Sequence, residues 1–153
     1  MVEVHWTAYI TAFTVPALAT AAAIIAYRQW RTAQNKLKLD LFDKRMLVYQ
    51  AVRDTLGYIA AHGKISQEQQ IKYLTGIQSA QWLFGPEIHK YLHETLWHKI
   101  VDLQLHSNLS SRDNDDRDER TRHIHLEAET LKWLIKQYSV LDDMCAKYMS
   151  LGH

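Results

Sequence analysis

The clearest structural signal in this chain is LKWLIKQYSVLDDMCAKY, residues 131–148. Apolar side chains recur in this stretch at steps of three and four residues, which is the spacing of one helix face. The positions that share the face are Leu131, Leu134, Tyr138, Leu141, Cys145 and Tyr148. This heptad spacing predicts a long helix, from Thr121 to Leu151, that packs along another helix of the same chain or of a second copy.

Residues 28–61 carry a second stripe and contain no proline and only one glycine. The stripe consists of Leu37, Leu41, Val48, Val52, Leu56 and Ile59. We therefore expect one continuous helix here, ended by Gly63, because glycine readily adopts the left-handed conformation that closes a helix. Ser66 has a side chain suited to cap the next helix. On that helix we expect Ile71, Leu74, Ile77, Gln78 and either Gln81 or Trp82 to face inward.

The sequence Phe84-Gly85-Pro86 predicts the boundary between the second and third helices, since proline suits the first turn of a helix. The third helix is expected to run from Pro86 to Leu109. Its apolar face is formed by Ile88, Tyr91, Leu92, Leu96, Ile100 and Leu103. Short turns of this kind predict an all-α fold, an antiparallel bundle of about four helices.

Two segments interrupt this pattern. Residues 107–120, SNLSSRDNDDRDER, are polar and predict a solvated linker or a frayed helix tip. Residues 6–27, WTAYITAFTVPALATAAAIIAY, carry no charge and would span about 33 Å as a helix, enough to cross a bilayer. Aromatic residues lie near both ends of this second segment, as in interfacial belts, and Pro16 should loosen its middle.

The charges around residues 6–27 predict its orientation. Only Glu3 and His5 precede it, whereas four basic residues, Arg28, Arg31, Lys36 and Lys38, follow it. The positive-inside rule then predicts a bacterial inner-membrane protein with an extracytoplasmic tail of residues 1–5, a transmembrane helix over 6–27 and a cytoplasmic domain over 28–153. A cleaved signal peptide is disfavoured because the first five residues lack Lys and Arg, and a soluble core helix because the run is apolar on every face.

Composition excludes several function classes. Lys plus Arg (18) nearly balances Asp plus Glu (17), which argues against a general nucleic-acid binder. The single cysteine, Cys145, excludes a disulfide framework within one chain and fits a reducing compartment. The sequence contains no Gly-rich phosphate loop and no nucleophile elbow, so we assign no catalytic residue and no cofactor.

Histidines offer the strongest candidate for metal chemistry. His89 and His93 lie four residues apart and share a helix face, and a third ligand would come from His123 or His125. His93 and His98 are five residues apart, which does not match the zinc-protease motif HExxH. Solvent-exposed helix histidines are the simpler interpretation. The acidic cluster from Asp113 fails as a calcium loop because its sixth and twelfth positions lack the required Gly and Glu.

Three stretches carry a resemblance. They are QWRTA with KLKLDLFDKR and VY in residues 29–49, AQWLFGPEI with YL in residues 80–92, and WLIKQ through YM in residues 133–149. Together they resemble small bacterial single-pass membrane proteins of unknown function with one N-terminal hydrophobic helix. Trp82 and Pro86 depart from that pattern. The resemblance implies a membrane anchor and helices, but no activity or catalytic residue.

Three functions compete at this level. The first is a non-enzymatic, membrane-tethered interaction module that assembles with itself or with a cytoplasmic protein. The second is a membrane-acting effector in stress or phage defence, whose Ala- and Thr-rich span would form a bundle in the bilayer. The third is a metal-dependent enzyme built on the helix histidines. We favour the first, because no motif demands catalysis.

Overall fold

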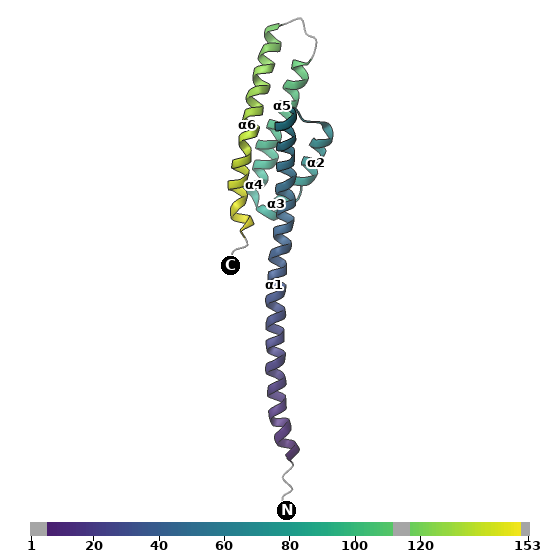
Figure 1. The fold of residues 1–153 in the computed structure, drawn as a ribbon, viewed down its shortest axis with the longest axis vertical. Helices are drawn as coiled ribbons and strands as arrows, with labels where there is room; N and C mark the ends of the chain where they lie inside the picture. The colour runs from purple at the N-terminus through teal and green to yellow at the C-terminus, as the bar shows by residue number, and fades with distance from the viewer. Residues whose placement is uncertain (1–5, 112–116, 151–153) are drawn as a thin grey trace, which may run out of the picture. The chain divides into compact units, whose positions relative to one another are not determined.

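The computed structural model describes the backbone of residues 6–111 and 117–150, with side chains described at Thr14 and from Pro16 onward in these ranges. Every regular element in these ranges is a helix (Figure 1). The helices are α1 (Trp6–His62), α2 (Gln67–Ile77), α3 (Ala80–Phe84), α4 (Pro86–Lys90), the π-helix η1 (Tyr91–Leu96), α5 (Trp97–Ser110) and α6 (Arg117–Met149). The predicted all-α class is confirmed. The chain divides into two compact units, residues 1–40 and 41–153, and each is described by itself.

Unit 1 contains the first part of α1, which passes through Pro16 as a helix. All of its described side chains are exposed, including the apolar Leu18 (70%) and Ile24 (57%). Within the described portion of the chain, no helix is long and apolar enough to cross a membrane. Residues 6–27 are thus helical, as expected. The expectation that they cross a membrane is not supported by their hydropathy in the described residues.

Three of the helix boundaries predicted in unit 2 are confirmed. α1 ends before Gly63, which has φ of 69° and donates its N–H to the Ile59 carbonyl over 2.8 Å. The Ser66 side chain caps α2 by accepting from the Gln69 N–H. Gly85 takes φ of 91°, outside the helical range, and Pro86 opens α4. Glycine is suited to both positive-φ positions because it has no Cβ.

The inward face predicted for the second helix is confirmed at Ile77 and wrong at its other positions, since Gln78, Gln81 and Trp82 are exposed. Ile71 is 59% and Leu74 38% exposed, while Tyr73 and Ile77 are buried. The helix also stops at Ile77 and resumes as α3, where Ala80 and Phe84 continue the buried face. Gly76 lies on this face against Ala51 of α1, at a distance that leaves no room for a Cβ. The close approach of α1 and α2 therefore requires that α2 pack against α1 through the face that contains Gly76.

The third predicted helix is continuous but contains the π-helical turn η1. In that turn the Trp97 N–H bonds to the Leu92 carbonyl, five residues back. The same carbonyl accepts a 2.8 Å hydrogen bond from the buried hydroxyl of Tyr73, whose ring stacks on Trp97 at 5.9 Å between centroids. Burial raises the pKa of Tyr73 far above its ordinary value, so the hydroxyl stays protonated and donates. Tyr73 thus attaches α2 to the widened turn.

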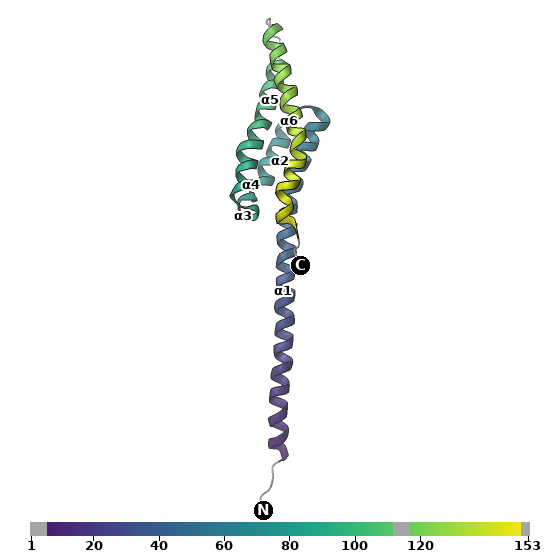
Figure 2. The same cartoon turned by 90° about the vertical axis from the view of Figure 1, so that its left-hand side faces the viewer.

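The α5 and α6 helices lie side by side in both views (Figures 1 and 2). The predicted seam of α1 is buried at Val48, Val52, Leu56 and Ile59, and that of α5 at Ile100 and Leu103. The predicted seam of α6 is buried at Leu134, Leu141 and Cys145, whereas its other members, Leu131, Tyr138 and Tyr148, are half-buried. Leu37 and Leu41, expected on the α1 stripe, are exposed. Both ends of the expected 107–120 linker are helical, since α5 reaches Ser110 and α6 begins at Arg117; Asp113, Asp115 and Asp116 lie outside the described residues.

Arg45 joins three parts of unit 2. Its Nε donates to the Leu83 carbonyl over 2.9 Å and its Nη1 to the Tyr148 carbonyl over 2.6 Å. The guanidinium also lies 5.8 Å from the centroid of the Tyr148 ring. Because a planar guanidinium presents several N–H groups in fixed directions, one side chain can hold the last turn of α6 and the end of α3 against α1.

Candidate functional site

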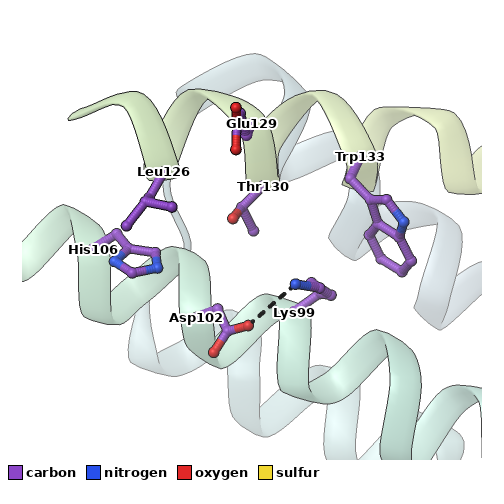
Figure 3. A pocket seen from close by; sticks show the side chains of 7 residues that line it. All are labelled: Lys99, Asp102, His106, Leu126, Glu129, Thr130 and Trp133. Atoms are coloured by element: carbon purple, nitrogen blue, oxygen red, sulfur yellow. Dashed lines mark hydrogen bonds and ion pairs between the residues drawn. The ribbon is translucent and has the colours of Figure 1, made fainter. Parts of the chain in front are cut away.

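A cavity of about 270 Å³ lies between α5 and α6 (Figure 3). The α5 helix supplies residues spaced by three and four positions, and α6 supplies the opposite wall. The lining residues are Lys99, Asp102, His106, Leu126, Glu129, Thr130 and Trp133. The cavity is therefore a groove formed by facing positions of two adjacent helices, with polar side chains on the α5 wall and both polar and apolar side chains on the α6 wall.

Charges in the groove partly neutralise each other. Lys99 Nζ lies 3.5 Å from Asp102 Oδ2, the only ion pair shown in Figure 3. Both side chains are nearly half exposed, so the pair contributes little to stability. Glu129 adds a carboxylate on the other wall, and the aromatic ring of Trp133 closes one end. These groups suit the binding of a small polar or cationic species, and they contain no nucleophile held by a base.

The other end of the groove brings two histidines together. Nδ1 of His106, on α5, lies 3.4 Å from Nδ1 of His123, on α6. The ring centroids are 5.6 Å apart. Ser110 lies one turn after His106 on α5, and Glu127 lies one turn after His123 on α6. The Ser110 hydroxyl donates to Glu127 Oε2 over 3.1 Å. Four polar side chains thus make two contacts across the end of the α5–α6 hairpin.

His89 and His93 form a second pair. Their ring centroids are 4.3 Å apart, which confirms that they share a helix face. His89 Nδ1 and His93 Nε2 are buried and have no hydrogen-bond partner. Burial, and then the proximity of His89, lowers the pKa of His93, against a smaller opposite effect of the Ile77 backbone. The pair is therefore half-buried and favours the neutral form of His93.

The four histidines singled out from the sequence do not form one cluster. His123 pairs with His106 instead, and His125 is exposed on α6. Across residues 6–111 and 117–150, no three His, Cys, Asp or Glu side chains are grouped to hold a metal ion. The expected third ligand therefore does not reach His89 and His93 in this structure.

Comparison with known proteins adds nothing to the geometry of the groove and of the two histidine pairs. No known protein family, curated protein or solved structure matches the chain. The resemblance to small bacterial membrane proteins remains an expectation from the sequence.

Sequence reasoning missed His106, Asp102 and Lys99 as parts of a site. The signal that could have found them is their position relative to the α5–α6 hairpin. His106 lies four residues before the end of α5, and His123 lies six residues after the start of α6. Residues at similar distances from the tip of an antiparallel hairpin face each other, so these two could have been paired from the helix ends.

The His93 environment predicts acid sensitivity of unit 2. The pKa of His93 in the folded chain is below its ordinary value of 6.5, so the unfolded chain takes up this proton first. Its contribution to stability is full above pH 6.5 and falls as the pH drops toward the folded pKa. We expect urea unfolding of the full chain, with a chelator present, to show the loss between pH 7.5 and about pH 5, and His93→Gln to reduce the slope.

His125→Gln is the matched control for this experiment, because His125 is exposed. It should leave the pH dependence unchanged. If His93→Gln and His125→Gln have the same slope as the original chain, the half-buried pair does not cause the acid sensitivity.

Proposed function

We propose that this chain is a membrane-tethered helical interaction module without catalytic activity. The N-terminal part of α1 inserts into the bacterial inner membrane, with residues 1–5 outside, and the helices of unit 2 bind a protein partner on the cytoplasmic side. The partner is a second copy of the chain or a cytoplasmic protein.

One observation carries the tether. Residues 6–27 have no charge, and basic residues follow at once from Arg28. The described apolar side chains in this run are exposed, with Leu18 at 70% and Ile25 at 55%. Apolar surface on this scale is favoured in contact with lipid, and the basic residues behind it match the charge of the inner leaflet.

Exposed apolar side chains in unit 2 support the interaction role. Trp82 of α3 is 82% exposed, and Ile71 of α2 is 59% exposed. Tryptophan is enriched among the residues that dominate binding at protein interfaces. A large aromatic ring left in water is therefore the best candidate for direct contact with the partner.

Alkaline extraction of bacterial membranes tests the tether. We expect the full chain to stay in the membrane pellet and to be released by detergent. A double variant, Leu18→Arg with Ala21→Arg, should move to the soluble fraction, because each arginine near the middle of a span costs about 2.5–3.5 kcal/mol. Green fluorescent protein fused after His153 should fluoresce, since it matures on the cytoplasmic side.

The matched control is Leu39→Arg with Leu47→Arg, which changes two exposed leucines outside the uncharged run. This variant should remain in the pellet. A folded chain that is soluble without detergent would contradict the tether. Chemical cross-linking in the same membranes should give adducts that weaken with Trp82→Ala, and a strictly monomeric chain with no adduct would contradict the interaction role.

A further inference from the structure

We propose that His106 and His123 form a binding site for a divalent transition-metal ion, with zinc as the reference ion, that joins α5 to α6. The ion would be held by the Nδ1 atoms of the two rings, with water in the remaining positions. The two residues of this site lie outside residues 6–27 and differ from the exposed Trp82 and Ile71. The site also differs from the His89–His93 pair, which the sequence spacing indicates as the candidate metal site.

The distance between the two nitrogens is the first argument. The Nδ1 atoms are 3.4 Å apart. Two imidazole nitrogens that each lie 2.0–2.1 Å from a tetrahedral zinc ion are separated by about 3.3 Å. Without an ion, the two nitrogens are within reach of a long hydrogen bond whose donor depends on the ring tautomers. The observed spacing also matches that of two ligands of one ion.

The source of the two ligands is the second argument. One histidine comes from each helix of a packed hairpin, so the helices fix the spacing before the ion arrives. Both side chains are only half-buried, so a hydrated ion can reach them. Glu127, which accepts from Ser110, adds negative charge one turn from His123. Two imidazoles held in place by packed helices, with a carboxylate nearby, are favourable surroundings for zinc or a similar cation.

The number of protein ligands sets the character of the site. The described residues contain no group of three or more His, Cys, Asp or Glu placed for a metal. Two histidines with water give reversible binding, unlike the closed four-ligand sites that are required for folding. We therefore expect the ion to stiffen the end of the α5–α6 hairpin when it is present, and the chain to fold without it.

Calorimetric titration with zinc chloride tests the proposal on the full chain in a mild detergent at pH 7.5, produced with a tag that contains no histidine. We expect one ion to bind per chain. His106→Gln and His123→Gln should each weaken binding by about tenfold or more, since even outer-shell changes cost 10–100-fold. Long-range nitrogen NMR of the original chain should show zinc-dependent shifts at Nδ1 of both histidines, and this second measurement requires no variant to fold.

Two controls separate this site from the other histidines. His125→Gln, an exposed change on α6, should bind zinc as the original chain does. A His89→Gln and His93→Gln double variant should also keep the binding. Absence of zinc binding in the original chain would overturn the proposal, as would loss of binding in the His89/His93 variant with retention in His106→Gln. Shifts at Nε2 alone would overturn the assignment of the ligand atoms.

Discussion

Tyr73→Ala lowers the free energy of unfolding by about 3–5 kcal/mol, the range for truncating a large buried aromatic side chain. Tyr73 is fully buried, stacks on Trp97 and donates to the Leu92 carbonyl within the π-helical turn. Alanine removes the ring, opens a cavity between α2 and η1, and leaves that carbonyl with the Trp97 N–H alone. Urea unfolding of the full chain, followed by circular dichroism, measures the loss.

Two control variants separate the contribution of the Tyr73 ring to stability from that of its hydroxyl group and from that of an exposed ring. Tyr73→Phe keeps the ring and removes only the hydroxyl, so it should cost about 1 kcal/mol, the net value of a typical hydrogen bond. Trp82→Ala removes a ring that is 82% exposed and should change stability by less than about 0.5 kcal/mol. If Tyr73→Ala costs no more than Trp82→Ala, Tyr73 does not attach α2 to the rest of unit 2.

Gly76→Val should destabilise the chain by about 3 kcal/mol, at the upper end of the range for overpacked positions. A Cβ at residue 76 would overlap the Cβ of Ala51, and valine adds two methyl groups beyond it. The α1 and α2 helices would have to separate, which would also loosen the packing of Tyr73 and Ile77. Unfolding of the full chain in urea again provides the measurement.

A double-mutant cycle identifies the contact responsible. Gly76→Ala gains about 1 kcal/mol of helix propensity and yet should be less stable than the original chain, because its methyl group has no room. Ala51→Gly removes the opposing methyl group, so the two changes together should show a favourable interaction energy of about 1 kcal/mol or more. A Gly76→Ala chain that equals or exceeds the original in stability would contradict the close helix approach.

The helix boundaries were predictable because they depend on local chemistry. Gly63, Ser66 and the Gly85–Pro86 pair act through their own backbone or side-chain preferences, whatever lies around them. The seam of α6 was predictable for a similar reason, since its spacing alone defines one face. These features are confirmed in the described residues.

The orientation of α2 was not predictable from apolar spacing. In its sequence Ile77 can share a face either with Ile71 and Leu74 or with Tyr73, and hydrophobicity alone prefers neither. The neighbouring helix decides, because only the face with Gly76 lets α1 approach closely. A glycine inside a short helix is therefore a better indication of the packed face than the number of leucines and isoleucines.

The extent of packing along α1 was also not predictable. Leu37 and Leu41 continue the stripe toward the N-terminus, but both are exposed. Periodicity defines which face of a helix is apolar, and it carries no information about where the partner helices end. Arg45, which binds the carbonyl of Tyr148 in the last turn of α6, marks the end of that packing, and Leu41 lies one turn beyond it.

The candidate site depended even more on tertiary structure. His106 and His123 are 17 residues apart in the chain, on two different helices. Their contact depends on where α5 ends and α6 begins, and the polar stretch expected over residues 107–120 obscured both ends. The π-helical turn was likewise not predictable, because its sequence, YLHETL, contains no proline or glycine.

The contact made by Arg45 has a consequence for how the chain can evolve. Its hydrogen-bond acceptors at positions 83 and 148 are main-chain oxygens, which every amino acid provides. Substitutions at those two positions would leave the hydrogen bonds intact, whereas lysine at position 45 would lose the planar geometry that serves both. Correlated changes between homologues would therefore not reveal these two hydrogen bonds, and their only trace in an alignment would be an invariant arginine at position 45.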